Sequence, residues 1–217
     1  DVDRDDSVRA CIAELLQRAG RIDVLVNNAG RAMVGACEET TADEARALFE
    51  TNVFGVMRVT AEVLPAMRAQ GGGVIVNLGS ASGIMGVPFH GVYSATKHAL
   101  AGWSQALRYE VEPFGVRVAL IEPAAHRTNI MMSRPRALME HYAAGRDGVE
   151  AIIRGQIETG ASPELVVDAI VAAATGASTR FRHRVGGKAR LAALGALLPG
   201  WLLDRVVRRE FALFRRG

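Results

Sequence analysis

The two residues best suited to chemistry are a phenol and an ammonium group, Tyr93 and Lys97, spaced four positions apart. On a helix this spacing places both side chains on one face, one turn apart. A tyrosine hydroxyl has an ordinary pKa of about 10, too high for efficient proton transfer at neutral pH, and a nearby positive charge lowers it. The pair therefore predicts a tuned proton donor and acceptor. A core tyrosine beside an exposed lysine has the same spacing and is the alternative.

Other polar residues stand where such a site would need them. Ser80 follows one short apolar run, and the sequence NNAG at 27–30 follows another. In open parallel sheets, binding sites form outside the carboxyl ends of the strands. Asn52 lies in the middle of a predicted helix, where asparagine is a poor helix former. Each residue alone is an ordinary loop, cap or surface residue, whereas their combination indicates a site.

The elements that must position these residues alternate between short apolar runs and longer helical patterns. Runs typical of buried strands occupy 22–27, 73–78, 116–121 and 181–186. Helices are predicted over 5–19, 91–112 and 162–175. A further helix begins at a capping box at Thr41 and runs towards Leu64, with a kink at Pro65. The last predicted helical segment is 191–214, with a break at Pro199-Gly200. The alternation implies one α/β domain over the whole chain: a Rossmann-like, doubly wound parallel sheet with helices on both faces.

The composition agrees with a folded enzyme-like domain. The chain has 217 residues, of which 49% are hydrophobic and 23% charged, which excludes a disordered or fibrous protein. Two cysteines, Cys11 and Cys37, form no disulfide framework, and the five scattered histidines predict no metal site. Reduced cysteines fit a cytoplasmic location. No apolar stretch is long enough to span a membrane.

The positive charges are unevenly distributed in type and position. Only Lys97 and Lys188 among the 26 basic residues are lysines. Residues 1–179 hold 16 basic and 21 acidic side chains, whereas residues 180–217 hold 10 and 2. A basic tail on a mildly acidic body, without a recognition motif, predicts no nucleic-acid partner.

The motifs and their order resemble the classical short-chain dehydrogenase/reductase (SDR) family. The resemblance rests on NNAG at 27–30, the helical Asn52, Ser80, the YxxxK motif at 93–97 and Pro123 after the next strand. It implies an oxidoreductase that transfers a hydride between NAD(P)(H), with NADP slightly preferred, and an alcohol or ketone. It also implies a homodimer or homotetramer. A catalytically silent binding or scaffold protein on the same fold is the alternative.

The resemblance assigns a role to each residue of the site. Tyr93 would give or take the proton on the substrate oxygen, and Ser80 would hydrogen-bond that oxygen. Lys97 would lower the pKa of Tyr93 and hold the nicotinamide ribose, and Asn52 would hold a water that relays the proton. The implied coenzyme-binding residues are Asp1, Asn27, Ala29, Gly30, Tyr93, Lys97, Pro123 and Thr128.

Two features depart from the family pattern. The Gly-rich turn TGxxxGxG, which cradles the coenzyme pyrophosphate, has no counterpart, and Asp1-Val2 resembles the end of the family's third strand. We therefore expect a fragment without the N-terminal strands, with an apolar edge exposed at 22–27 and weak coenzyme binding. The usual Pro-Gly is Pro123-Ala124, so Thr128 matches the family threonine only approximately.

Apolar residues dominate the segments that form the substrate pocket in the family, including the region 125–160, which is predicted to be irregular. Methionine adapts to irregular apolar space. A hydrophobic, steroid-, retinoid- or lipid-like substrate is expected, bound by Ser80, Met85, Tyr93 and Met131, although ordinary core packing would also use such residues. The apolar set is Met33, Met85, Val87, Pro88, Phe89, Ile130, Met131, Met132 and Met139.

Residues 188–217 form a basic, amphipathic extension similar to the tail of hydroxysteroid- and retinol-dehydrogenase-like members. A helix of this kind can lie on an anionic membrane surface. The favoured interpretation is that it docks on its own fold or on a second subunit, and peripheral membrane contact is the alternative. Apolar Leu197, Leu198, Trp201, Leu202, Val206, Phe211 and Phe214 are interleaved with Arg205, Arg208, Arg209, Arg215 and Arg216.

Overall fold

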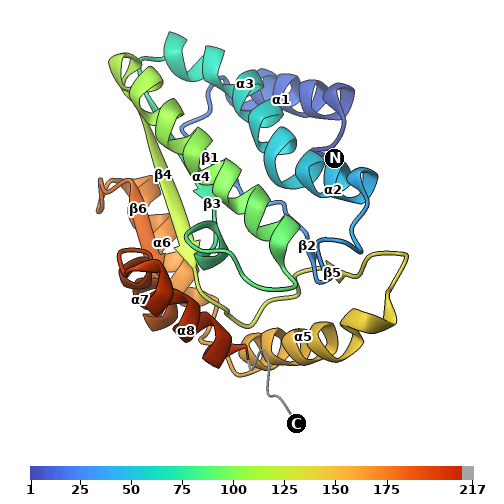
Figure 1. Ribbon diagram of the computed structural model, residues 1–217. Helices are drawn as coiled ribbons and strands as arrows, with labels where there is room; N and C mark the ends of the chain where they lie inside the picture. The colour runs from blue at the N-terminus through green and yellow to red at the C-terminus, as the bar shows by residue number, and fades with distance from the viewer. Residues whose placement is uncertain (212–217) are drawn as a thin grey trace.

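The structure, a computed structural model, describes residues 1–211. Phe214, Arg215 and Arg216 of the predicted tail helix lie outside the described residues. The centre is a sheet of four parallel strands in the order β1-β3-β4-β6 (Figure 1). These strands are β1 (Val24–Asn27), β3 (Gly73–Leu78), β4 (Val116–Pro123) and β6 (Arg182–Val185). The four predicted strands and their parallel arrangement are confirmed.

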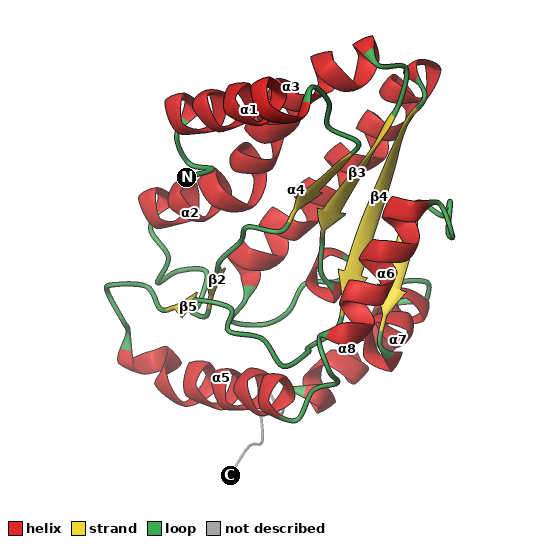
Figure 2. Ribbon diagram, turned by 180° about the vertical axis from the view of Figure 1, so that it is seen from behind, coloured by secondary structure: helices red, strands yellow, loops and turns green. Residues whose placement is uncertain are grey.

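Helices cover both faces of this sheet, as Figures 1 and 2 show from opposite sides. They are α1 (Asp5–Ala19), α2 (Ala42–Phe49), α3 (Gly55–Ala69), α4 (Gly91–Val111), α5 (Ala143–Glu158), α6 (Glu164–Thr175), α7 (Gly187–Gly195) and α8 (Gly200–Glu210). Helices α3 and α4 pack on one face, with α1 against α3, and α6 packs on the other. The doubly wound architecture is therefore confirmed.

The apolar alternation along the strands explains the two layers of core. On one face, Ile75 of β3 and Val118 of β4 pack against Met67 of α3 and Leu107 of α4. On the other face, the intervening β3 and β4 side chains pack against α6. Strand β1 is one edge of the sheet, and Val24 and Val26 are each 39% exposed. The exposed apolar edge predicted at this strand is thus present.

The long helical segment after Thr41 differs from its prediction in one respect. The capping box is present, since Thr41 Oγ1 accepts from the Glu44 amide at 3.2 Å and the Glu44 carboxylate accepts from the Thr41 amide at 2.9 Å. Helix α3 continues without a break through Pro65, the position of the predicted kink. The departure lies at Glu50–Phe54, where a π-helical turn joins α2 to α3.

The prediction that residues 125–160 are irregular is wrong. This region contains the short strand β5 (Met132–Ser133), which pairs with β2 (Ala32–Met33), a 3-10 turn at Glu140–Tyr142, and the 16-residue helix α5. Three glycines within α5 weaken its helical pattern in the sequence. One of them, Gly145, is required by packing, because an added Cβ would lie 2.6 Å from Phe89 Cζ.

Candidate active site

A cavity of about 950 Å³ lies beyond the carboxyl ends of β1, β3 and β4. Loops after these three strands line it, together with the start of α4 and with α5, α6, α7 and α8. This is the edge at which a parallel sheet binds its ligands. The expected site residues that line the cavity are Ala29, Gly30, Ser80, Met85, Tyr93, Lys97, Pro123, Thr128 and Met131.

Tyr93 and Lys97 lie one turn apart on α4, as their spacing predicts. Both are buried, with 8% and 6% of their surface exposed. Ser80, two residues after the end of β3, forms a side-chain hydrogen bond with Tyr93. Lys97 Nζ lies 5.8 Å from the centre of the Tyr93 ring and donates to the Leu78 carbonyl at 2.8 Å. The sheet end and one face of α4 therefore bring the three groups together.

Burial dominates the titration of the tyrosine and the lysine. Burial raises the pKa of Tyr93, and the hydrogen bond with Ser80 opposes that shift. Burial lowers the pKa of Lys97 to about 8, because the charged ammonium loses hydration. The predicted lowering of the Tyr93 pKa by Lys97 is thus not found in this structure, where the ammonium is directed at the Leu78 carbonyl. At pH 7 Tyr93 carries its proton.

Asn52 is fully buried in the π-helical turn and fixes two parts of the site. Its Oδ1 accepts from the Arg31 amide at 2.9 Å, and its Nδ2 donates to the Arg31 carbonyl at 2.9 Å. Nδ2 also donates to Thr96 Oγ1 at 3.0 Å, and Thr96 is the residue before Lys97. The asparagine thus ties α4 to the loop after β1.

Two residues expected to bind the coenzyme lie elsewhere. The Asn27 side chain donates to Asn77 Oδ1 at 2.8 Å and to Thr60 Oγ1 at 3.2 Å, so it is part of a buried network that joins β1, β3 and α3. Asp1 is exposed, and its amino group donates to Ser7 Oγ at 2.7 Å. Neither residue lines the cavity.

Comparison with known proteins agrees with this site. A sequence model of the short chain dehydrogenase family matches residues 1–139. The chain belongs to the short-chain dehydrogenase/reductase family. It is 35% identical over 218 residues to a 3-ketodihydrosphingosine reductase of Bacteroides thetaiotaomicron, covering 99% of this chain and 80% of that relative. The protein is therefore an SDR oxidoreductase that uses NAD(P).

Solved structures support the same assignment. A short-chain dehydrogenase from Streptomyces avermitilis is 37% identical, with a TM-score of 0.83 over 98% of this chain and 76% of that chain. A gluconate 5-dehydrogenase from Burkholderia cenocepacia, solved with NADP and tartrate, is 27% identical in sequence. Its TM-score is 0.71, over 88% of this chain and 73% of that chain. These similarities extend over the sheet and the helices that carry the SDR site.

The residues that an SDR coenzyme would contact fit such a group. A Cβ added to Gly30 would lie 3.3 Å from Asn52 Oδ1 and 3.8 Å from Lys97 Nζ, so glycine leaves room beside both. An ammonium has three donors, and Leu78 accepts from Lys97, which leaves donors for the hydroxyls of a ribose. Pro123, the last residue of β4, and Thr128, in the loop after it, also line the cavity.

Two histidines that the sequence interpretation left unassigned also line the cavity. His90 and His126 are buried, with 7% and 4% exposed, and the Nε2 atom of each has no hydrogen-bond partner among the described residues. His126 Nδ1 lies 2.8 Å from the Ala124 carbonyl. The His90 ring stacks on Tyr93, with ring centres 4.4 Å apart and an angle of 18° between planes. The only signal in the sequence was the position of His90, three residues before Tyr93.

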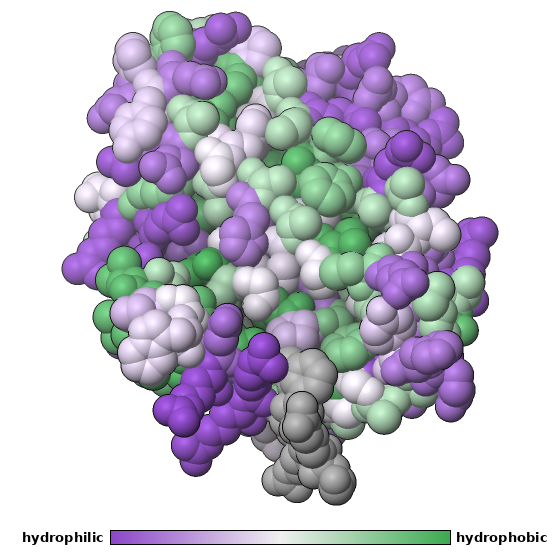
Figure 3. All heavy atoms as spheres, viewed as in Figure 1, coloured by the Kyte–Doolittle hydropathy of each residue, from purple (hydrophilic) through white to green (hydrophobic). Residues whose placement is uncertain are grey.

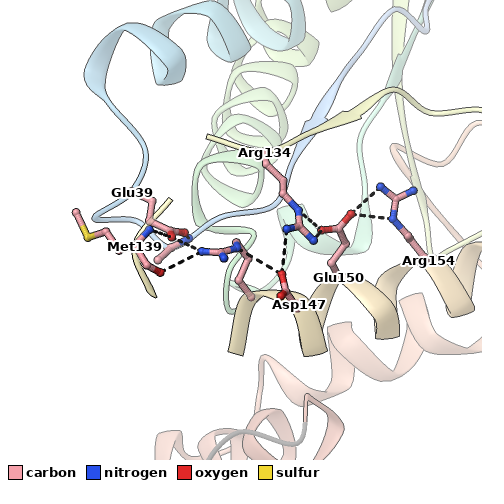
Figure 4. Close-up of polar contacts among 8 residues, drawn as sticks. Glu39, Arg134, Met139, Asp147, Glu150 and Arg154 are labelled. Carbon is pink, nitrogen blue, oxygen red and sulfur yellow. Dashed lines mark hydrogen bonds and ion pairs between the residues drawn. The ribbon is translucent and has the colours of Figure 1, made fainter. Parts of the chain in front are cut away.

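Helix α5 forms the outer wall of the cavity and is held in place by ion pairs (Figure 4). Glu39, in the loop after β2, accepts from the Met139 amide at 2.8 Å and pairs with Arg146 of α5. Burial alone would raise the pKa of Glu39, but the Met139 and Ala36 amides and the Arg146 charge hold it below its ordinary value. The same helix carries Glu150, which is buried and paired with Arg134 and Arg154 at 2.5 and 2.6 Å.

Helices α7 and α8 complete this wall. They break at Pro199-Gly200, as predicted, and the inner face of α8 lines the cavity through residues such as Leu203 and Val207. Glu210 of α8 accepts from Lys188 of α7 at 2.8 Å and from Gln156 of α5 at 3.1 Å. The described part of the tail, residues 188–211, therefore docks on its own fold. Among the described residues, no helix is long and apolar enough to cross a membrane.

Proposed function

We propose that this SDR interconverts hydrophobic ketones and alcohols with NADP(H) as the coenzyme, and that Tyr93 is its proton donor and acceptor. The observation that carries the proposal is a buried Tyr93, hydrogen-bonded to Ser80, in a cavity whose far walls are apolar. NADP is favoured because solved relatives of this fold bind NADP. The proposed catalytic set is Asn52, Ser80, Tyr93 and Lys97.

In the reducing direction, each side chain acts at a defined atom. NADPH, when bound, supplies the hydride that reaches the carbonyl carbon. Tyr93 Oη gives its proton to the carbonyl oxygen, so that the ketone gains one hydride and one proton and becomes an alcohol. Ser80 Oγ donates a hydrogen bond to the same oxygen and stabilises the charge that develops there. Lys97 holds the ribose hydroxyls and stabilises the phenolate that Tyr93 leaves behind.

The proposed role of Asn52 is to position the helix that carries the reacting groups, and to hold a water that returns a proton to Tyr93. Its support is the set of hydrogen bonds to Arg31 and Thr96, which fix the backbone next to Lys97. Protein groups engage both the oxygen and the nitrogen of the Asn52 amide, which supports the positioning role.

The substrate proposed is a lipid-like ketone. A cavity of about 950 Å³ is at the upper end of the range that holds small molecules. Its outer walls present apolar side chains from six segments. The relative from Bacteroides thetaiotaomicron is named as the reductase of a ketone, 3-ketodihydrosphingosine. Side chains that form these walls are Met85, Met131, Ile157, Ile170, Leu191 and Val206.

Replacing Tyr93 by phenylalanine tests the reaction. In Tyr93→Phe, kcat/KM for reduction of a long-chain ketone should fall by about 10²- to 10⁴-fold, because the proton donor is removed while the ring remains. Coenzyme binding, measured by calorimetry, should persist. The control is Tyr109→Phe on the same helix, where the tyrosine is 59% exposed. Equal turnover in Tyr93→Phe and the wild type would refute the proposal, and coenzyme binding without turnover in the wild type would favour the silent scaffold.

We also propose that the protein is cytoplasmic and forms a homo-oligomer, and that the corner between α7 and α8 makes a peripheral contact with anionic membranes. Leu194, Leu197 and Trp201 are 63%, 82% and 69% exposed. Figure 3 shows apolar side chains beside hydrophilic ones over these helices. Arg205 and Arg209 of α8 are exposed. Exposed leucines and tryptophan beside arginines suit a lipid headgroup layer.

Vesicle sedimentation tests this contact. The wild type should pellet with vesicles that contain phosphatidylglycerol and much less with pure phosphatidylcholine, and Leu197→Asp should weaken the pelleting. Absence of pelleting with both vesicle types, together with a dimer or tetramer in light scattering, would assign the corner to a subunit interface instead.

A further inference from the structure

The proposed reaction requires Ser80 to offer its hydroxyl proton to the substrate oxygen, and a serine hydroxyl rotates unless a neighbouring group fixes it. A hydroxyl has one donor and two acceptor positions. The Ser82 amide donates to Ser80 Oγ at 3.1 Å, so the backbone fills one acceptor position. Ser80 and Tyr93 both line the cavity and are hydrogen-bonded to each other. The rest of the Ser80 hydroxyl is therefore available where the substrate oxygen has to lie.

The Ser82 amide belongs to a 3-10 turn at Ala81–Gly83, which begins directly after Ser80. The Gly83 amide donates to the Ser80 carbonyl at 2.9 Å, and the Ile84 amide donates to the Ala81 carbonyl at 3.0 Å. Ser80 has an extended backbone and caps the turn through its side chain. This is the arrangement in which a serine oxygen satisfies an amide at the start of a helical turn. The turn therefore holds both the backbone and the hydroxyl of Ser80.

The same turn is seated against α4 at Lys97. A Cβ added to Gly83 would lie 2.8 Å from the Lys97 carbonyl oxygen and 3.2 Å from Lys97 Cβ. Because helix backbone cannot swing away as the end of a long side chain can, this close approach requires glycine. On the other side of Ser80, the Leu78 carbonyl accepts from Lys97 Nζ at 2.8 Å. The segment that carries Ser80 is thus fixed to α4 both before and after the serine.

We propose that Ser82 and Gly83 are positioning residues for the reaction. The Ser82 amide orients the Ser80 hydroxyl towards the substrate oxygen, and Gly83 sets the distance of Ser80 from Tyr93 and Lys97. The inference rests on the proposed function, in which Ser80 stabilises the charge that develops on that oxygen. A hydroxyl that accepts a hydrogen bond is also a stronger donor, because hydrogen bonds in a chain polarise one another.

Ser82→Pro, which lacks the amide hydrogen, tests the orientation of the Ser80 hydroxyl. In the natural full chain with NADPH and a long-chain ketone, kcat should fall about tenfold, the effect of one lost hydrogen bond, while KM changes by no more than about twofold. In a Ser80→Ala background the same substitution should lower kcat by less than about twofold, because no hydroxyl remains to be oriented. No loss of kcat, or an equal loss in both backgrounds, would overturn the inference.

Gly83→Ala tests the close approach to α4, and it remains informative if Ser82→Pro does not fold. We expect kcat to fall by about tenfold, because the added methyl group displaces Ser80 from Tyr93 and Lys97. The control is Gly86→Ala in the same loop, where an added Cβ meets no atom within 4 Å. It should change kcat by less than about twofold. Equal kcat in the two alanine variants would overturn the role of Gly83.

Crystal structures separate failure of the inference from failure of the proposed function. If the wild type reduces no ketone, the proposed function fails, but the orientation of Ser80 is still observable. The Ser80 side chain should occupy one rotamer in the wild type and more than one in Ser82→Pro, whatever the activity. A single, unchanged Ser80 rotamer in Ser82→Pro would overturn the inference.

Discussion

The two walls of the cavity are built by different physical means. The wall formed by the sheet ends and α4 is polar, buried and tied by direct hydrogen bonds: Asn52 makes three of them, and Lys97 donates to the Leu78 carbonyl. The wall formed by α5, α7 and α8 presents mostly apolar side chains to the cavity. Ion pairs hold this wall: Glu39–Arg146 joins α5 to the loop after β2, and Lys188–Glu210, which itself lines the cavity, joins α7 to α8.

The difference separates chemistry from recognition. In the α4 wall, each reacting atom has to be held within a fraction of an ångström, which buried hydrogen bonds can do. In the opposite wall, the residues only need to exclude water and accommodate an apolar chain, so many side chains are acceptable. Substitutions in the first wall should therefore change turnover, whereas those in the second should change stability or KM.

Exchanging the buried lysine for arginine tests the first wall and should have the largest effect. Lys97→Arg keeps the charge but replaces a compact ammonium with a planar guanidinium, which cannot fit beside Leu78 and Gly30. We expect kcat/KM to fall by about 10²- to 10³-fold. The control is Lys188→Arg, which preserves an exposed ion pair with Glu210. Its kcat/KM should fall far less than that of Lys97→Arg. Equal losses would mean that lysine is not specifically required at 97.

Removing the buried carboxylate tests the second wall. Glu39→Gln leaves Arg146, which is 4% exposed, with only the longer contact to Asp147 at 3.6 Å. We therefore expect a loss of about 3 kcal/mol in the free energy of unfolding, measured in urea. The control is Glu38→Gln, at the neighbouring exposed carboxylate that accepts from the Tyr142 hydroxyl. It should leave the urea midpoint nearly unchanged. If both variants were equally stable, the ion pairs would not hold this wall.

The two walls should also fail at opposite ends of the pH scale. Burial lowers the pKa of Lys97 to about 8, so kcat/KM should decline as the pH rises through 8 and the ammonium is lost. The folded-state pKa of Glu39 lies below its ordinary value of 4.5, so its stabilisation is fully present above that value and is lost as the pH falls through the folded pKa. Urea midpoints of the wild type and Glu39→Gln should converge in acid. Parallel curves would contradict this assignment.

The sequence was informative about the first wall, formed by the sheet ends and α4, because the chemistry restricts which residues can stand there. Tyr93, Lys97 and Ser80 are chemically constrained, so their types and spacing identify them, and the capping box at Thr41 and the four apolar strands depend on local rules. Asn27 was harder to interpret, because an amide that follows a strand can point into the cavity or, as found, towards Asn77.

The second wall was poorly predicted because its stability comes from contacts that are distant in sequence. Helix α5 is rich in glycine, and it is held by Glu39, about a hundred positions away, through Arg146. The π-helical turn at Glu50–Phe54 and the left-handed φ of 55° at Phe89 likewise follow from tertiary packing, with no local pattern to announce them. His90 is a single histidine, and only its stacking on Tyr93 shows that it belongs to the site.

The smallest effect is expected where α8 closes the cavity. Glu210 is half exposed and accepts from Lys188 and Gln156, so Glu210→Gln should alter stability little. Because these contacts hold α8 against α5 and α7, KM for a long-chain ketone should rise by about threefold while kcat stays unchanged. Glu158→Gln, at the exposed end of α5, is the control. A fall in kcat instead would show that the tail wall positions the reacting carbonyl, and the separation of chemistry from recognition would no longer hold.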